Sequence, residues 1–173
     1  MKRLPILILS ALAATVLHAG GYGLGLQTAV NVAPGQAVVP RVDYLHSTDH
    51  ASAAGPFAPI DMDSTADILA LGADYEYYFR GRSDRGPYVL GGLGVAFATL
   101  DVTGSTPGAS NRTTSHQTRL YPEVGAGWQF NRYLGLELLY RSLGLQDVTV
   151  SVAGATAGFS YPDSVDLALT VRF

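Results

Sequence analysis

The chain has 173 residues, with 11 basic and 14 acidic residues, no cysteine and a single lysine. The acidic balance argues against a nucleic-acid binder, and the absence of cysteine excludes disulfide bonds and thiolate chemistry. Twenty glycines, ten tyrosines and a mean hydropathy of +0.18 without a long apolar run are typical of alternating β-strands.

Residues 1–19 predict a secretory signal peptide. Two basic residues open the chain, an apolar stretch follows, and Leu17-His18-Ala19 offers an acceptable cleavage site, while Ala14 marks a weaker one. The apolar stretch is shorter than the about 20 residues that a membrane-spanning helix needs. We therefore expect export with removal of residues 1–19, and a single domain over residues 20–173.

Seven segments alternate between apolar and polar residues with the period of two that is typical of β-strands. The clearest is the last, in which Val165, Leu167, Leu169, Val171 and Phe173 share one face. The predicted strands cover residues 22–32, 37–46, 65–80, 87–102, 112–130, 133–150 and 164–173. Pro40 lacks a backbone donor, so we expect a bulge or an edge at that position.

The connections between the predicted strands alternate in length. Short turns are expected near residues 33–36, 81–86 and 131–132, and long loops near 47–63, 104–112 and 151–163. Bacterial outer-membrane barrels have this pattern, with their short turns in the periplasm. Aromatic residues that abut the short turns predict an interfacial girdle: Tyr75, Tyr77, Phe79, Trp128, Phe130, Tyr133 and Phe173. The predicted fold class is all-β, a transmembrane antiparallel up-and-down β-barrel of about eight strands.

Seven readable strands leave the count odd, whereas bacterial single-chain barrels have an even number. Three explanations remain. Residues 147–159 could form a strand of their own, part of the predicted signal could be retained as a strand, or the chain lacks a first strand. A soluble exported β-sheet protein is the alternative fold, and its apolar face would need a cover.

Several segments resemble small outer-membrane β-barrel proteins, the family of the outer membrane protein A transmembrane domain, outer membrane protein X and the opacity proteins. They are the hairpin Trp128–Leu138, the strand Gly86–Gly94 and the terminus Leu169–Phe173. The resemblance implies an outer-membrane location and contact with outer-membrane lipid and lipopolysaccharide. It also implies biogenesis by periplasmic chaperones and the barrel assembly machinery, and we expect a monomer. The family's peptidoglycan-binding domain is not expected, since nothing follows Phe173.

The same resemblance implies that the terminal strand carries the recognition signal for the assembly machinery. That role would fall to the apolar side chains of its lipid-facing side: Val165, Leu167, Leu169, Val171 and Phe173.

Charged residues gather on the strand face opposite the apolar one. An arginine that faces lipid near the bilayer midplane costs about 2–4 kcal/mol, so this face is expected to line the lumen. Eight strands leave an interior that side chains just fill. The sequence therefore predicts an arginine–carboxylate network that closes the lumen, and hydrated charges along a narrow aqueous path are the alternative. The predicted members are Arg41, Asp43, Asp74, Glu76, Arg80, Arg119, Glu123, Glu137, Arg141, Asp166 and Arg172.

His46 and Ser47, with Asp43 and Asp49 as acids, are the candidate residues for a serine–histidine catalytic set. Asp43 and Ser47 would share a strand face that excludes His46, and the Phe-x-His-x-Ser pattern of lipid A deacylases does not occur. The acids of residues 47–63 lack calcium-loop spacing. We expect no enzyme, no metal and no cofactor.

The expected function is a structural or surface-interaction role with outer loops displayed to the exterior. A narrow pore for small solutes is the first alternative, and a lipid A-modifying or lipase-type enzyme is the second.

Overall fold

The computed structural model describes residues 14–18, 21–54, 59–81, 84–152, 155–159, 161 and 163–171. These residues form eleven β-strands: β1 (Ala14–His18), β2 (Gly21–Gln27), β3 (Val30–Ala33), β4 (Gln36–Ala54), β5 (Pro59–Tyr78), β6 (Gly86–Thr106), β7 (Ala109–Gln129), β8 (Leu134–Arg141), β9 (Val148–Val152), β10 (Ala155–Phe159) and β11 (Ser164–Val171). Over the described ranges, no helix has the length and apolar character needed to cross a membrane.

The strands pair in a closed antiparallel ring. The order is β2-β1-β11-β8-β7-β6-β5-β4, and β4 pairs back with β2. The short strand β3 continues β2 along the same edge of β4. Because each consecutive strand of the wall lies next to its predecessor, the arrangement is an up-and-down barrel, and the predicted fold class of about eight strands is confirmed.

The eighth wall strand is β1, in agreement with the second explanation for the odd count, in which part of the predicted signal forms a strand. β1 lies within the range predicted as signal peptide and pairs with both β2 and β11. The prediction that residues 147–159 could add a wall strand is wrong, because β9 and β10 pair only with each other in a separate two-stranded sheet.

A proline explains why the first long strand is split into β2 and β3. Thr28 donates its backbone N–H to the carbonyl of Pro40 at 3.2 Å. Pro40 has no N–H to return the second bond of this antiparallel pair. The ladder is therefore interrupted at Thr28 and Ala29, as expected for a proline inside a strand pair.

A second proline explains why β8 ends early. The prediction of one continuous strand over residues 133–150 is wrong, because β8 ends at Arg141 and residues 148–150 belong to β9. Ser142 donates its N–H to the carbonyl of Pro122 at 3.2 Å, and Pro122 has no N–H to return. Gly144 then turns the chain with a φ of +56°. The segment after Arg141 therefore leaves the wall.

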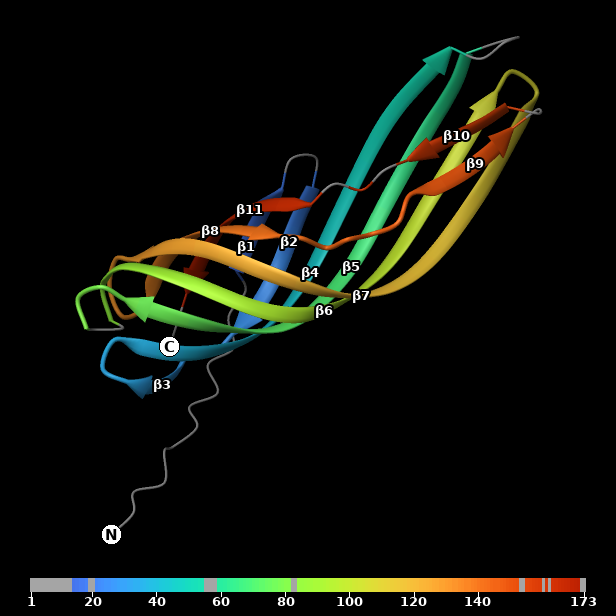
Figure 1. Cartoon of the computed structure of the whole chain (residues 1–173). Helices are drawn as coiled ribbons and strands as arrows, with labels where there is room; N and C mark the ends of the chain where they lie inside the picture. Colours follow the sequence, from blue (N-terminus) through green and yellow to red (C-terminus); the bar gives the residue numbers. More distant parts are fainter. Residues whose placement is uncertain are drawn as a thin grey trace.

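Four strands continue far beyond the rest of the ring (Figure 1). The predicted outer loops at 47–63 and 104–112 are wrong in large part, because β4 and β5 pair through residues 48–54 and 59–65, and β6 and β7 pair up to Thr106 and Ala109. The pairs His46–Asp67, Asp67–Thr99 and Thr99–His116 mark the base of this outer part. We call residues 46–67 and 99–116 the extension.

The β9–β10 hairpin lies along the upper parts of β6 and β7 (Figure 1). Val148, Val150 and Val152 of β9 are buried there in the main apolar core. Gly104 of β6 makes room for them, because a Cβ at this position would lie 2.8 Å from the Cγ2 of Val152. β9, which covers the end of the predicted strand 133–150 and the start of the predicted loop 151–163, thus contributes a packed cover.

Replacement of Val150 by alanine should loosen this cover. The lost methyl groups and the cavity are expected to cost about 1–3 kcal/mol. Hydrogen exchange measured by mass spectrometry should show faster exchange of the β9 amides. Thr149→Ala is the matched control, since the side chain of Thr149 is exposed, and equal exchange in both variants would contradict the packing.

Candidate functional site

The outward face of the wall is a continuous apolar belt. Leu93 is 72% exposed and Leu120 is 82% exposed, although both lie in the middle of long strands. The large exposed apolar side chains include Tyr22, Leu24, Leu26, Val42, Tyr44, Leu69, Leu71, Tyr75, Tyr77, Val89, Leu93, Phe97, Leu120, Val124, Trp128, Leu136, Leu138, Tyr140, Val165, Leu167 and Leu169. A patch of this extent requires an apolar cover, and lipid supplies one.

Aromatic side chains lie exposed next to the short turns. Tyr77 and Phe79 contact each other edge to face with ring centroids 5.7 Å apart, and the guanidinium of Arg132 lies 4.5 Å from the ring centre of Tyr133. Trp128 and Phe130 are also exposed. This arrangement fits an interfacial girdle at the end of the barrel that carries the short turns. Phe173 lies outside the described residues.

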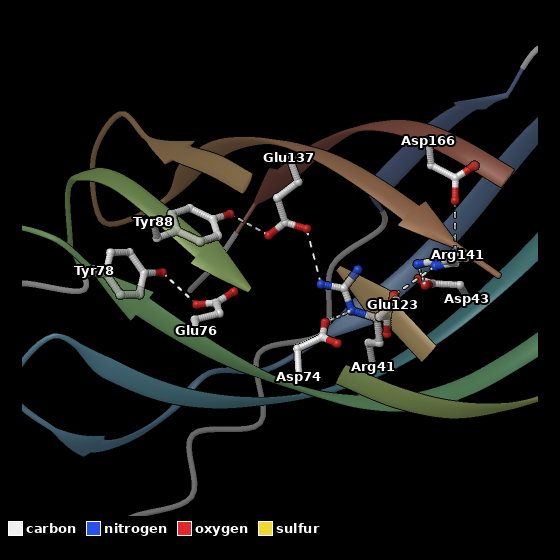
Figure 2. A network of polar contacts seen from close by, with 10 residues as sticks. All are labelled: Arg41, Asp43, Asp74, Glu76, Tyr78, Tyr88, Glu123, Glu137, Arg141 and Asp166. Atoms are coloured by element: carbon white, nitrogen blue, oxygen red, sulfur yellow. Dashed lines mark hydrogen bonds and ion pairs between the residues drawn. The ribbon is translucent and has the colours of Figure 1, made fainter. Parts of the chain in front are cut away.

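Arg141 of β8 is the centre of a buried ion-pair cluster in the lumen (Figure 2). Its Nε donates to Oε2 of Glu123 at 2.9 Å, its Nη1 lies 3.3 Å from Oδ2 of Asp166, and its Nη2 contacts Asp43. The side chain of Arg141 is fully buried, as are those of Glu123 and Asp166. One guanidinium therefore holds carboxylates from three other strands.

Arg41 of β4 forms a second cluster nearer the short turns (Figure 2). Its Nε lies 2.6 Å from Oδ2 of Asp74, and its Nη2 donates to Oε2 of Glu137 at 3.2 Å. Tyr88 donates its hydroxyl to the other oxygen of Glu137 at 2.6 Å. Tyr78 donates to Oε2 of Glu76 at 2.7 Å.

Both clusters span the lumen. β4 and β8 lie on opposite sides of the ring, since three strands separate them in either direction. Arg41 of β4 reaches Glu137 of β8, and Asp43 of β4 reaches Arg141 of β8. These contacts cross the interior from wall to wall, so the polar middle of the barrel is filled by side chains.

The outer end of the interior is closed in a different way. Leu45, Ile68, Leu100 and Leu143 belong to one buried apolar cluster with the valines of β9. Above the charged clusters, the lumen is therefore an apolar core.

The structure brings most of the predicted lumen residues together inside the barrel. Eight of the predicted eleven are buried in the interior: Arg41, Asp43, Asp74, Glu76, Glu123, Glu137, Arg141 and Asp166. Arg119 is half-buried on the same face, and its Nε has no hydrogen-bond partner. The prediction for Arg80 is wrong, because β5 ends at Tyr78 and Arg80 is exposed in the following turn. Arg172 lies outside the described residues.

The tyrosines of the network were not predicted as members. Tyr78 follows Glu76 by two residues, so its inward direction follows from strand alternation. Tyr88 was not predicted to face the lumen. The glycine opposite it in the strand pair, Gly127, is the sequence signal that could have indicated its inward direction. A Cβ on Gly127 would lie 2.3 Å from Cζ of Tyr88, so the glycine provides space for the ring.

The residues considered as a catalytic set do not converge. Asp43 is held by Arg141 inside the lumen, whereas Nδ1 of His46 lies 2.7 Å from Oδ1 of Asp67 on the outward side. Tyr44 also donates to this aspartate oxygen, at 2.6 Å. Within the described ranges, no group of three or more histidine, aspartate or glutamate side chains is placed to hold a metal ion.

The outward face of the extension carries cross-strand polar pairs. Nδ1 of His50 lies 2.7 Å from Oδ1 of Asp63. Arg112 donates from Nε to Oδ1 of Asp101 at 3.2 Å and places Nη2 3.0 Å from Oδ2, and Thr114 donates to the same carboxylate. These bonds from Arg112 and Thr114 lower the pKa of Asp101 below its usual value. The extension is therefore a polar surface beyond the apolar belt.

An apolar outer belt around a polar, filled lumen defines the class of protein: a transmembrane up-and-down β-barrel. The fold is similar to that of Ail, the attachment invasion locus protein of Yersinia pestis, in a crystal structure with the heparin analogue sucrose octasulfate. That match has 12% sequence identity and a TM-score of 0.50, over 93% of this chain and 92% of that chain.

A second crystal structure of Ail matches over the same shares of both chains, with 12% identity and a TM-score of 0.49. No family model and no curated protein matches the chain. At 12% sequence identity, the similarity to Ail shows the fold alone.

The filled lumen predicts that the protein does not conduct ions steadily. Reconstituted in a planar lipid bilayer, it should show no large, persistent conductance, because cross-lumen ion pairs and the apolar core both block the axis. Insertion must be verified in the same bilayers by protease protection of the barrel. A large steady conductance would favour the hydrated path over the closed network.

Proposed function

We propose that this protein is an outer-membrane barrel with a surface-interaction role, and that the extension is the surface it presents. The observation that carries the proposal is the contrast between the two parts of the molecule. The interior is filled, whereas four strands continue beyond the belt as a paired and covered sheet. Such ordered structure outside the membrane is suited to contact with another molecule. The proposal assigns no catalytic role.

The negative charge of the extension and of the segment that covers it, residues 142–163, supports a basic partner. Residues 46–67, 99–118 and 142–163 contain seven aspartates, three histidines and a single arginine, without glutamate or lysine: Asp49, Asp61, Asp63, Asp67, Asp101, Asp147 and Asp163, with His46, His50, His116 and Arg112. Electrostatic complementarity favours an oppositely charged surface. The Ail structure holds an analogue of heparin, which is a polyanion. The acid-rich surface of this chain would repel such a ligand, so we propose a basic polypeptide instead.

Binding to two charged polymers tests this proposal. The purified barrel in detergent micelles is expected to bind polyarginine at low salt, to lose it as salt screens the charges, and not to bind heparin. Asp61→Asn with Asp63→Asn should weaken polyarginine binding, while the control Asp84→Asn, in the turn between β5 and β6, should not. Binding of heparin, or equal binding by both variants, would contradict a basic partner.

Export, location and biogenesis belong to the same proposal. The belt supports outer-membrane lipid and lipopolysaccharide as its surroundings. Val165, Leu167 and Leu169 are exposed on β11, which suits the recognition role that the resemblance implies for them. Recognition by the assembly machinery, periplasmic chaperones and the monomeric state remain predictions.

A further inference from the structure

The wall of the barrel closes through a segment of the predicted signal peptide. β1 pairs with β2 along Ala14–His18, and with β11 at the partners Thr15–Leu169, Val16–Ala168 and Leu17–Leu167. It is the only described strand that lies between β2 and β11.

Removal of β1 would leave a seam within the membrane. β2 would be paired only with β4, and β11 only with β8. Backbone donors and acceptors on the two free edges would have no water to bind in the hydrocarbon region, and open sheet edges do not occur there.

The free edges could not restore an ordinary antiparallel barrel by pairing with each other. β1 is antiparallel to both β2 and β11, so these two strands run in the same direction. Their direct pairing would be parallel in a wall of seven strands, whereas bacterial single-chain barrels have an even number of antiparallel strands. With β1 in place, the wall begins and ends at the same side of the membrane.

We infer that the mature chain retains β1 and that the signal peptidase cuts between Ala13 and Ala14. Cleavage after Ala19 would remove all of β1. The sequence Ala11-Leu12-Ala13 has small residues at both positions that the small-x-small pattern requires, whereas Leu17-His18-Ala19 begins with a large one.

In this step, water hydrolyses the amide between the two alanines. The carbonyl carbon of Ala13 becomes the carboxylate of the leader, and the nitrogen of Ala14 becomes the amino terminus of the barrel. The leader would have about 13 residues, slightly below the usual range of about 15–30, so the position of the amino terminus is the decisive observation.

The intact mass of the full-length gene product, isolated from the envelope, tests the cleavage site. A mature chain that begins at Ala14 supports the inference, and one that begins at Gly20 or at any other residue overturns it. Ala13→Leu should block processing and Ala19→Leu should leave the mature mass changed only by the substitution. Blocked processing in Ala19→Leu would also overturn the inference.

Cysteine pairs test the position of β1 independently, because the chain has no cysteine of its own. Val16→Cys with Ala168→Cys, and Leu17→Cys with Leu167→Cys, place thiols at adjacent partner positions of β1 and β11. Since pairs alternate between wide and narrow spacing, at least one of them should form a disulfide. Val16→Cys with Thr149→Cys on β9 is the control. No reductant-sensitive mobility change in either pair, or the same change in the control, would contradict a retained first strand.

Discussion

Arg141→Ala is expected to lower the free energy of unfolding by about 3–5 kcal/mol, the usual cost of removing one partner from a buried ion pair. The guanidinium contacts Glu123, Asp43 and Asp166, and it is completely buried. Without it, the carboxylates lose their common cation in an interior that water reaches poorly. Urea unfolding of the barrel in lipid vesicles, followed by the fluorescence of Trp128, the single tryptophan, measures the change.

Arg112→Ala is the matched control for this variant. Arg112 also binds a carboxylate, that of Asp101, but the pair is on the exposed surface of the extension. Surface pairs contribute little because water and salt screen them. The two variants should therefore differ strongly, and an Arg141→Ala protein as stable as Arg112→Ala would show that the lumen cluster is hydrated and dispensable.

Leu120→Arg should lower the free energy of unfolding from a bilayer by about 2–4 kcal/mol, the cost of an arginine on the lipid face near the midplane. Leu120 is 82% exposed on the belt, so the substitution removes no packed core side chain. The expected loss comes only from contact with hydrocarbon. Folding into lipid vesicles, measured by the gel mobility of unheated and heated samples, gives the folded fraction at each urea concentration.

Ser110→Arg is the control on the same strand. Ser110 faces outward in the extension, beyond the belt, and a surface substitution there should change stability by less than about 0.5 kcal/mol. If Leu120→Arg folded as well as Ser110→Arg, the apolar face would not be in contact with lipid, and the membrane-spanning barrel would be contradicted.

The two faces of the wall could be predicted from the sequence because strand alternation assigns every second residue to the same side. This reasoning placed Val165 and Leu167 toward lipid and Arg41 and Arg141 inside, although Arg41 and Arg141 are far apart in the chain. Alternation also failed where a strand ended. In the sequence, Arg80 continues the inward-facing alternation of β5, but the strand ends at Tyr78 and Arg80 belongs to a turn.

The positions at which strands end depend on which residues face each other across a strand pair, and the sequence alone does not give this register. Pro122 limits β8 only because the register brings Ser142 next to it. The sequence predicts loops in the extension because its glycines, prolines and aspartates are depleted in strands. Cross-strand pairs such as Arg112 with Asp101 stabilise the extension only after β6 and β7 align. The partners of Arg141 were likewise predicted as a set, but their geometry required the closed ring.

Site-specific labelling of living cells tests most directly whether the extension of a membrane barrel faces the exterior. A cysteine-free chain allows Ser110→Cys in the extension and Arg85→Cys in the short turn before β6 to be compared with one membrane-impermeant maleimide. The account predicts that Ser110→Cys reacts in intact cells and that Arg85→Cys reacts only after the outer membrane is opened. Reaction of Arg85→Cys alone in intact cells, or recovery of both variants in the soluble periplasmic fraction, would contradict it.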